Sequence, residues 1–257
     1  MLTNNEVKYF AGLKNKKIRD EEGKFLIEGL HLIKECLSSD LYYKDYIECI
    51  IARDNFDLTL LPLKDIEILY VSEKNFDKLS DTVNPQGIMA VVKKPEHSNR
   101  LHNSEKNKLI IALDNINDPG NLGTIIRTCY WFNADKILIS KNSVDLYNSK
   151  VLRASQGAVF HTDVVTEADI RTELLHLKGE YQILLTDLSA KKNLSELNIK
   201  KNQRYIIVFG NEANGISDEI KNQGFDFIKI DSFSDCESLN LSVSAGIILN
   251  HFANALK

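Results

Sequence analysis

The chain has 257 residues, which is enough for two small domains or one large one. Hydrophobic residues make up 43% and charged residues 26%, and there are only 12 glycines and 4 prolines. This composition excludes collagen-like, linker-like and low-complexity architectures over most of the chain. The longest apolar runs are about five residues, far short of the roughly 18 that a membrane-spanning helix needs. The first six residues lack the basic and apolar pattern of a signal peptide, which predicts a cytoplasmic protein.

Cysteines and histidines give no sign of a metal site. The four cysteines lie far apart and never form C-x-x-C, which favours buried thiols over disulfides or zinc ligands. The six histidines are equally scattered, so we predict no metal. With a net charge of −4, the chain lacks the overall positive charge that is usual in proteins that bind nucleic acids. From Lys8 to Arg19, however, the chain carries a local charge of +5, which is either a solvated basic face or a contact surface for nucleic acid.

The first 95 residues are predicted to form a small α/β domain. Thr3 and Glu6 have the T-x-x-E spacing of a capping box, in which both side chains accept hydrogen bonds from free amides at a helix start. A short helix is therefore expected directly after Thr3. The apolar pattern predicts strands at residues 25–27, 46–52, 66–71 and 87–92, and helical segments at 30–37 and 76–79.

A polar stretch without periodicity, residues 96–107, is predicted to link this domain to a second one at residues 108–257. In the second domain, short apolar runs alternate with helical patterns. Strands are expected at 109–113, 136–139, 159–165, 181–185, 204–209 and 227–230, and helices after Asn121, near Lys150, at 167–177, after Ser217 and at 240–256. Such repeated units imply a parallel sheet covered by helices on both faces, with ligands at the carboxyl ends of the strands.

The first loop of chemical interest, residues 114–127, follows a buried strand and opens a helix, which is a natural site for an anion. Its glycines, Gly120 and Gly123, lack the G-x-G-x-x-G spacing of a dinucleotide site, so a nicotinamide cofactor is not expected. Arg127 has apolar neighbours in the sequence, where an unpaired guanidinium would be costly. It is therefore either paired within the structure or in contact with a phosphate or carboxylate of a ligand.

Two further loops place polar residues where a strand leads into a helix. In residues 209–217, helix capping explains Ser217 but not Asn211 and Glu212, which lie at the carboxyl end of the strand. Residues 230–240 precede the terminal helix. There, Ser238 and Asn240 are either helix caps alone or part of the same site.

Together, the three loops resemble the motifs of the SpoU (TrmH) family of RNA ribose 2′-O-methyltransferases. The first resembles D-P-x-N-x-G-x-x-x-R through Asp118, Pro119, Asn121, Gly123 and Arg127. The second resembles G-N-E-x-x-G-[IL]-S through Gly210, Asn211, Glu212, Gly215, Ile216 and Ser217. The third resembles S-L-N-V-S-x-A through Ser238, Leu239, Asn240, Ser242 and Ala245, with Leu241 in place of the usual valine. Residues 153–158, R-A-S-Q-G-A, also resemble a family segment.

The N-terminal part resembles the ribosomal-protein-like substrate-binding domain that many members carry, through residues 13–19 and 25–29. The resemblance implies an α/β fold: a C-terminal parallel-sheet SPOUT domain with a deep trefoil knot, preceded by a small α/β substrate-binding domain at residues 1–95. It also implies a homodimer with parts of the active site meeting across the interface, and RNA as the partner. Since phosphate contacts supply much of the affinity for RNA, the expected RNA contacts are Lys14, Lys16, Lys17 and Arg19.

The resemblance further implies that the chain transfers a methyl group from S-adenosylmethionine to a ribose 2′-hydroxyl of RNA. The expected catalytic residues are Arg127, Asn121, Glu212, Ser238 and Asn240. The expected cofactor contacts are Leu185, Thr186, Gly210, Ile230 and Leu239. The family assigns Arg127 a part in activating the hydroxyl. Because a guanidinium stays protonated in proteins, we expect Arg127 to bind a phosphate or the developing alkoxide while the proton leaves by another path.

Alternative functions are distinguished by a few features of the sequence. The separate N-terminal domain favours large-subunit ribosomal RNA as the substrate, with transfer RNA as the alternative. A non-catalytic RNA-binding protein of the same fold would be expected to lack Arg127, Asn121 or Glu212, and all three are present. A small-molecule α/β enzyme with a nucleotide cofactor would be recognised by binding NAD instead of S-adenosylmethionine.

Overall fold

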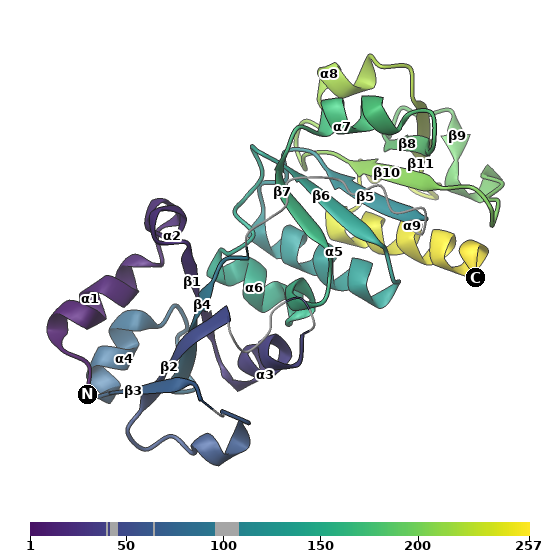
Figure 1. Ribbon diagram of the computed structural model, residues 1–257. Helices are drawn as coiled ribbons and strands as arrows, with labels where there is room; N and C mark the ends of the chain where they lie inside the picture. Colours follow the sequence, from purple (N-terminus) through teal and green to yellow (C-terminus); the bar gives the residue numbers. More distant parts are fainter. Residues whose placement is uncertain (40, 42–45, 64, 96–107) are drawn as a thin grey trace. The chain divides into compact units, whose positions relative to one another are not determined.

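The computed structural model of the chain describes residues 1–39, 41, 46–63, 65–95 and 108–257. It forms two compact units, Met1–Glu96 with Tyr147–His161, and His97–Leu146 with Thr162–Lys257 (Figure 1). The predicted linker, residues 96–107, lies outside the described residues. The segment Tyr147–His161, which the sequence placed in the second domain, packs within the first unit. The functional domain boundaries at residues 95 and 108 therefore stay a prediction.

The first unit contains a four-stranded sheet in the order β1-β4-β2-β3. Its strands are β1 (Lys24–Glu28), β2 (Ile47–Arg53), β3 (Glu67–Val71) and β4 (Ile88–Lys93). β1 and β2 run antiparallel to β4, and β3 runs parallel to β2. The four strands predicted in this part of the sequence are confirmed.

Helices cover both faces of this sheet (Figure 1). On one face lie α1 (Asn4–Gly12) and α4 (Glu73–Leu79), whose residues Val7, Phe10 and Phe76 are buried with Cys49 and Met89 of the sheet. On the other face, α3 (Leu30–Ser38) and α6 (Ser149–Ser155) pack on β1. The predicted capping box forms at the start of α1, which confirms the helix expected there.

Several short helices complete the first unit. α2 (Lys16–Glu22) was not predicted; Asn15 caps its start and Gly23 ends it with a φ of 62°. The 3₁₀ turns are η2 (Leu58–Leu60) and η3 (Ala158–Phe160). The left-handed φ at Gly23 suits glycine, which has no Cβ to clash with the backbone.

The second unit contains a seven-stranded sheet in the order β7-β6-β5-β10-β8-β11-β9, in which all neighbours run parallel. Its strands are β5 (Leu109–Leu113), β6 (Lys136–Ser140), β7 (Val164–Ala168), β8 (Gln182–Thr186), β9 (Lys192–Asn193), β10 (Tyr205–Phe209) and β11 (Asp226–Lys229). The predicted parallel sheet is confirmed. β10 lies between β5 and β8, so the loops that follow β5 and β10 are neighbours at the carboxyl edge.

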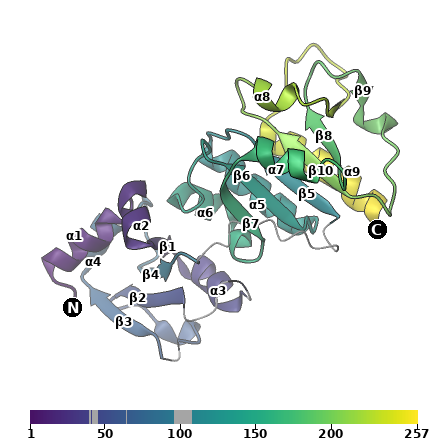
Figure 2. The ribbon, with the colours of Figure 1, turned by 45° about the horizontal axis from the view of Figure 1, so that its top comes forward.

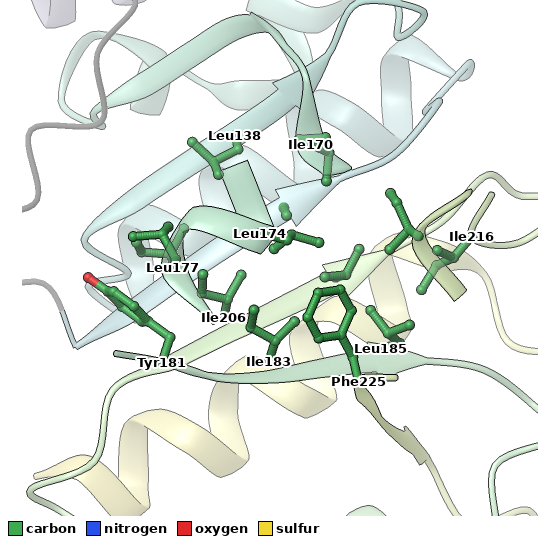
Figure 3. Packing of buried hydrophobic residues seen from close by; sticks show 14 of the residues in the cluster. Leu138, Ile170, Leu174, Leu177, Tyr181, Ile183, Leu185, Ile206, Ile216 and Phe225 are labelled. Atoms are coloured by element: carbon green, nitrogen blue, oxygen red, sulfur yellow. The ribbon is translucent and has the colours of Figure 1, made fainter. Parts of the chain in front are cut away.

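Helices also cover both faces of the second sheet (Figures 1 and 2). α5 (Pro119–Trp131) and α9 (Leu241–Leu256) pack together on one face, and α7 (Ile170–Leu177) and α8 (Asp218–Lys221) on the other. A 3₁₀ turn, η4 (Leu194–Glu196), lies near the edge strand β9. Figure 3 shows Leu174 and Leu177 of α7 packed with Ile183, Ile206 and Phe225. This continuous apolar layer fixes the strands whose ends carry the candidate site.

One predicted element is wrong in its first half. The expected strand at 159–165 begins instead at Val164, because the chain turns earlier, with positive φ at Gln156 (51°) and Gly157 (87°). The helix expected from residue 167 begins at Ile170, since the carboxylate of Asp169 accepts a hydrogen bond from the amide of Thr172 at the helix start.

Three of the four cysteines are buried and all four are free thiols, which confirms the expectation of buried thiols for Cys36, Cys49 and Cys129. Burial raises the pKa of Cys36 and of Cys49 to about 12. No helix in the described ranges has the length and apolar character needed to span a membrane. In those same ranges, no group of three or more His, Cys, Asp or Glu side chains could hold a metal ion.

Candidate active site

A buried aspartate holds the loops after β5 and β10 together. Asp114, only 4% exposed, accepts a hydrogen bond from the Ser217 amide at 2.8 Å and another from Asn115 Nδ2 at 3.0 Å. Asn211 Nδ2 donates to the Asn115 carbonyl at 2.7 Å. The sequence analysis did not select Asp114 as a site residue. Its position directly after a buried strand was the signal that could have found it.

The turn after β10 is tight and presents Glu212 to solvent. The backbones of Asn211 and Gly215 exchange two hydrogen bonds of 2.9 Å, and Asn211 Oδ1 accepts from the amides of Ala213 and Asn214. A Cβ on Gly210 would lie 2.2 Å from the carbonyl carbon of Gly215, so only glycine fits at position 210. The rigid turn therefore sets the position of Glu212.

Three side chains from the three predicted loops meet at the carboxyl edge of the sheet. Asn121 Nδ2 donates to Glu212 Oε1 at 3.0 Å, and Asn240 Nδ2 donates to Asn121 Oδ1 at 3.0 Å. The Glu212 carboxylate also accepts from the amides of Asn117 and Asp118, each at 3.4 Å. We call Asn121, Glu212 and Asn240 the polar junction.

Asn240 is both a helix cap and a member of the polar junction. Its Oδ1 accepts hydrogen bonds from the amides of Ser242 at 2.9 Å and Val243 at 3.3 Å, which caps α9. Its Nδ2 remains free to reach Asn121. Ser238 is exposed in the same loop, and its carbonyl accepts a hydrogen bond from the Cys236 thiol.

Arg127 lies on the exposed side of α5, so its apolar neighbours in the sequence do not bury it. The adjacent Ile126 is buried, but Trp131, one helical turn further on, is 82% exposed. Arg127 makes no hydrogen bond or ion pair with another described residue, and the side chains of Asn121 and Glu212 are bonded to other partners. Its guanidinium is therefore available to a ligand.

Of the expected cofactor contacts, Leu185, Thr186, Gly210 and Ile230 lie at the ends of β8, β10 and β11, and Leu239 lies just before α9. Leu185 is fully buried, and the Thr186 hydroxyl donates to the Val208 carbonyl at 2.9 Å. These two residues can therefore offer a ligand mainly their backbone groups, as Gly210 does. Ile230 is half-buried, and Leu239 is 49% exposed.

Asp187 stabilises the loop that follows β8. Its carboxylate accepts a hydrogen bond from the Ser189 amide at 2.9 Å and pairs with Lys221 Nζ at 3.0 Å. Burial pushes the pKa of Asp187 upward, but the bonds from Ser189 and Lys221 outweigh it and hold the pKa below the usual 3.8. The charged carboxylate therefore fixes this loop at neutral pH.

The basic segment divides into buried and exposed residues. Arg19 is only 4% exposed, and its Nη1 donates to the carbonyls of Leu13 at 2.9 Å and Lys14 at 2.7 Å. Lys14 Nζ donates to the Ser80 carbonyl at 2.7 Å and pairs with Asp81 at 3.2 Å. The prediction that Arg19 contacts RNA is corrected, because its guanidinium is buried and bonded to backbone carbonyls. Lys14 is exposed, and its contact with RNA stays a prediction.

The other two residues of the predicted RNA surface, Lys16 and Lys17, are exposed at the start of α2. Lys17 lies 3.8 Å from Glu21 in a solvent-exposed pair, which contributes little to stability. These two lysines therefore keep the exposure that a phosphate contact requires.

Comparison with protein families identifies the C-terminal part of the chain. The model of the SpoU rRNA Methylase family matches residues 108–250, more than half of the chain. The chain belongs to this family. The model of the MRM3-like substrate binding domain matches residues 4–90, so the N-terminal resemblance is confirmed as well.

Relatives of the chain match either nearly all of it or about two thirds of it. It is 29% identical to the 23S rRNA (guanosine(2553)-2'-O)-methyltransferase RlmP of Bacillus subtilis, over 96% of both chains. It is 32% identical to the mitochondrial rRNA methyltransferase 3 of Mus musculus, matching 68% of this chain but only 43% of the mouse protein. An AdoMet-bound rRNA methyltransferase structure from Sinorhizobium meliloti has a TM-score of 0.84 at 26% identity, covering 100% of this chain and 97% of that one.

Proposed function

We propose that this chain transfers a methyl group from S-adenosylmethionine to a ribose 2′-hydroxyl of ribosomal RNA. The polar junction carries the proposal, because it joins all three loops of the SpoU motifs at one edge of the parallel sheet. An exposed arginine, Arg127, follows on the same helix as Asn121. The names of the relatives, which are 23S rRNA and mitochondrial rRNA methyltransferases, support ribosomal RNA over transfer RNA.

Arg127 supplies the positive charge that the proposed reaction needs. A ribose hydroxyl is a weak acid, so the site must align it with the methyl group and stabilise the negative charge that develops on its oxygen. A guanidinium stays protonated and donates several N–H groups, which suits a phosphate or an alkoxide. Arg127 therefore binds the substrate oxygens, and a phosphate of the RNA accepts the proton.

The polar junction positions the ribose. Glu212 and Asn121 present acceptor and donor groups to solvent from a fixed turn and a helix start. Asn240 and the exposed Ser238 extend this polar surface. Because each member is held by at least one bond to another loop or to a helix end, little rearrangement is needed when RNA binds.

The loops at the carboxyl edge of the second sheet offer apolar side chains and backbone groups that suit S-adenosylmethionine. The loops after β8 and β11 expose three apolar side chains, Leu188 (66%), Phe233 (98%) and Leu239 (49%), and such surface is suited to covering a flat purine. Backbone groups at Leu185, Thr186, Gly210, Ile230 and Leu239 would hold the cofactor. When bound, it supplies an electrophilic methyl group on a sulfonium.

The N-terminal domain, residues 1–95, binds the RNA substrate in this proposal, and residues 96–107 link it to the methyltransferase domain at 108–257. Lys16 and Lys17 are exposed cations that contact phosphates. A ribosomal RNA substrate further supports action in the cytoplasm, where a bacterial relative would meet its RNA.

The chain acts as a homodimer in which the active site includes residues of both copies. The exposed apolar side chains of α5 and α9, Tyr130 (49%), Trp131 (82%), Val243 (50%) and Ile247 (39%), support this part of the proposal. Such a patch on packed helices is typical of a contact surface. We also propose that the C-terminal third of the chain forms a deep trefoil knot.

Methyl transfer to RNA tests the proposal. The protein is incubated with methyl-labelled S-adenosylmethionine and with unmodified ribosomal or transfer RNA in parallel. Wild type is expected to label ribosomal RNA, and Arg127→Ala to lose about 2–4 kcal/mol of transition-state stabilisation, or at least about thirtyfold in rate. Arg171→Ala, which removes an exposed arginine from α7, is the matched control and should keep full activity. Full activity in folded Arg127→Ala would overturn the role of Arg127.

A further inference from the structure

The first unit contains a cavity of about 220 Å³ that the proposed reaction does not use. It lies between β1, the turn from α1 to α2, the loop after α4, and α6. Its apolar walls include Leu13, Leu26, Leu32, Leu79, Met89 and Leu152. Its polar lining is formed by Lys14, Arg19, Glu28, Asp81, Asn148, Ser149 and Arg153.

Arg153 brings an unpaired donor to the lining of this cavity. Its Nη1 atom is buried and has no hydrogen-bond partner among the described residues. Buried polar groups are almost always paired, and leaving a charged donor unpaired is costly. Arg153 also begins the R-A-S-Q-G-A segment, which resembles a family sequence but has no place in the proposed reaction. A ligand atom that accepts a hydrogen bond would satisfy this donor.

The other two cations of the lining are already engaged. Lys14 pairs with Asp81 at 3.2 Å, and Arg19 donates to two backbone carbonyls. Glu28 forms no ion pair with a described residue. Its Oε1 accepts from the hydroxyls of Ser80 at 2.5 Å and Thr82 at 2.8 Å, and its Oε2 accepts from the Asp81 amide at 3.2 Å, which leaves one lone pair of Oε2 for a donor. The cavity thus offers one charged donor and one charged acceptor.

This combination selects a class of ligand. A phosphate would meet the carboxylates of Glu28 and Asp81 as well as Arg153, so it is a poor match. The cavity volume of about 220 Å³ is below the roughly 300–1,000 Å³ of sites that enclose a drug-sized ligand, and it suits a single ring system. A single nucleobase has apolar faces for the walls and both donors and acceptors on its edge.

We propose that this cavity binds one unstacked nucleobase of the RNA, with guanine preferred. Guanine offers acceptors to an arginine through O6 and N7, and one N–H of its N1–H and N2–H₂ groups can donate to Glu28 Oε2. Proteins commonly read RNA sequence by capturing single bases from loops and bulges. The biological role rests on the proposed RNA methyltransferase function, but the binding site itself does not.

Binding of mononucleotides to the full chain, without cofactor or RNA, tests the site independently of methyl transfer. GMP, AMP, CMP, UMP and inorganic phosphate are titrated by calorimetry. GMP is expected to bind most tightly and phosphate not to compete with it. Arg153→Met keeps the length of the side chain but removes its donors, and should weaken GMP binding by about tenfold, as expected for loss of one good base contact.

Two further variants separate the cavity from general charge and from folding. Lys150→Met removes one positive charge from the same helix but lies outside the cavity lining, so GMP affinity should stay within twofold of wild type. Ser149→Leu fills the rim while keeping Arg153, and should weaken GMP as Arg153→Met does. Circular dichroism checks that all three variants are folded.

Several results would overturn the proposal. Equal binding of all four nucleotides and phosphate would assign the site to a phosphate, and absence of any binding would make it a water-filled cavity. Unchanged GMP affinity in folded Arg153→Met would place the nucleotide elsewhere. If methyl transfer fails while GMP binding depends on Arg153, the proposed enzyme function is refuted and the base-binding site is supported.

Discussion

Asp114 is the residue whose removal most directly tests how the site loops are held. In Asp114→Ala, the Ser217 amide loses a charged acceptor at 2.8 Å, and Asn115 loses its side-chain partner. A hydrogen bond to a charged group contributes roughly 1.5–3 kcal/mol, and the second bond adds about 1 kcal/mol at most. We therefore expect a loss of about 2–4 kcal/mol in the free energy of unfolding, measured by urea denaturation followed by circular dichroism.

Asp114→Asn is a second, more conservative variant to compare with Asp114→Ala. Its Oδ1 can still accept from Ser217, and the Asn115 amide can turn to offer an oxygen to the new amide, so a loss of about 1 kcal/mol is expected. Asp235→Ala removes an exposed aspartate in the same unit and should change stability by less than about 0.5 kcal/mol. Hydrogen exchange should show the Ser217 amide unprotected in Asp114→Ala. A loss no larger than that of Asp235→Ala would refute this account of the loop junction.

Three further predictions concern other parts of the chain. Gly210→Ala places a Cβ 2.2 Å from backbone and should lower the free energy of unfolding by at least about 1–3 kcal/mol in urea denaturation, and unchanged stability would contradict the tight turn. Because the pKa of Asp187 is held below 3.8, its stabilisation is present above that pH and lost as the pH falls through the folded-state value. Asp187→Asn should therefore destabilise at pH 7 but much less at pH 2, and an equal effect at both would exclude the Lys221 pair as the cause. A thiol reagent at pH 8 should label exposed Cys236 before unfolding, whereas Cys36, with a pKa of about 12, should react only in denaturant; early labelling of Cys36 would contradict its burial.

The sequence predicted the parallel sheet and the convergence of the site because both depend on local patterns. Five-residue apolar runs such as Leu109–Leu113 and Tyr205–Phe209 are long enough for buried strands, and polar motifs directly after them lie at a shared edge. The bond between Asn121 and Glu212 joins residues 91 positions apart, and the motif order anticipated that they would meet. The dual use of Asn240, as a cap and as a member of the polar junction, was left open.

Side-chain exposure was harder to predict, because it depends on which helix face packs against the sheet. Arg127 has two isoleucines before it, yet points to solvent, and Arg19 lies in a basic run, yet is buried. The buried position of Arg19 follows from the unpredicted helix α2, which turns its guanidinium toward the carbonyls after α1. Likewise, the packing of Tyr147–His161 in the first unit depends on long-range contacts, such as that of His161 with Glu35 at 3.0 Å.

The nature of the methylated group is the most direct test of the proposed function. Unmodified ribosomal RNA is treated with the protein and labelled S-adenosylmethionine, digested to nucleosides and analysed by mass spectrometry. We predict a single 2′-O-methyl nucleoside that is absent when the target nucleotide carries a 2′-deoxyribose and is lost in Arg127→Ala. Label on a base, or 2′-O-methylation that persists in folded Arg127→Ala, would contradict the account.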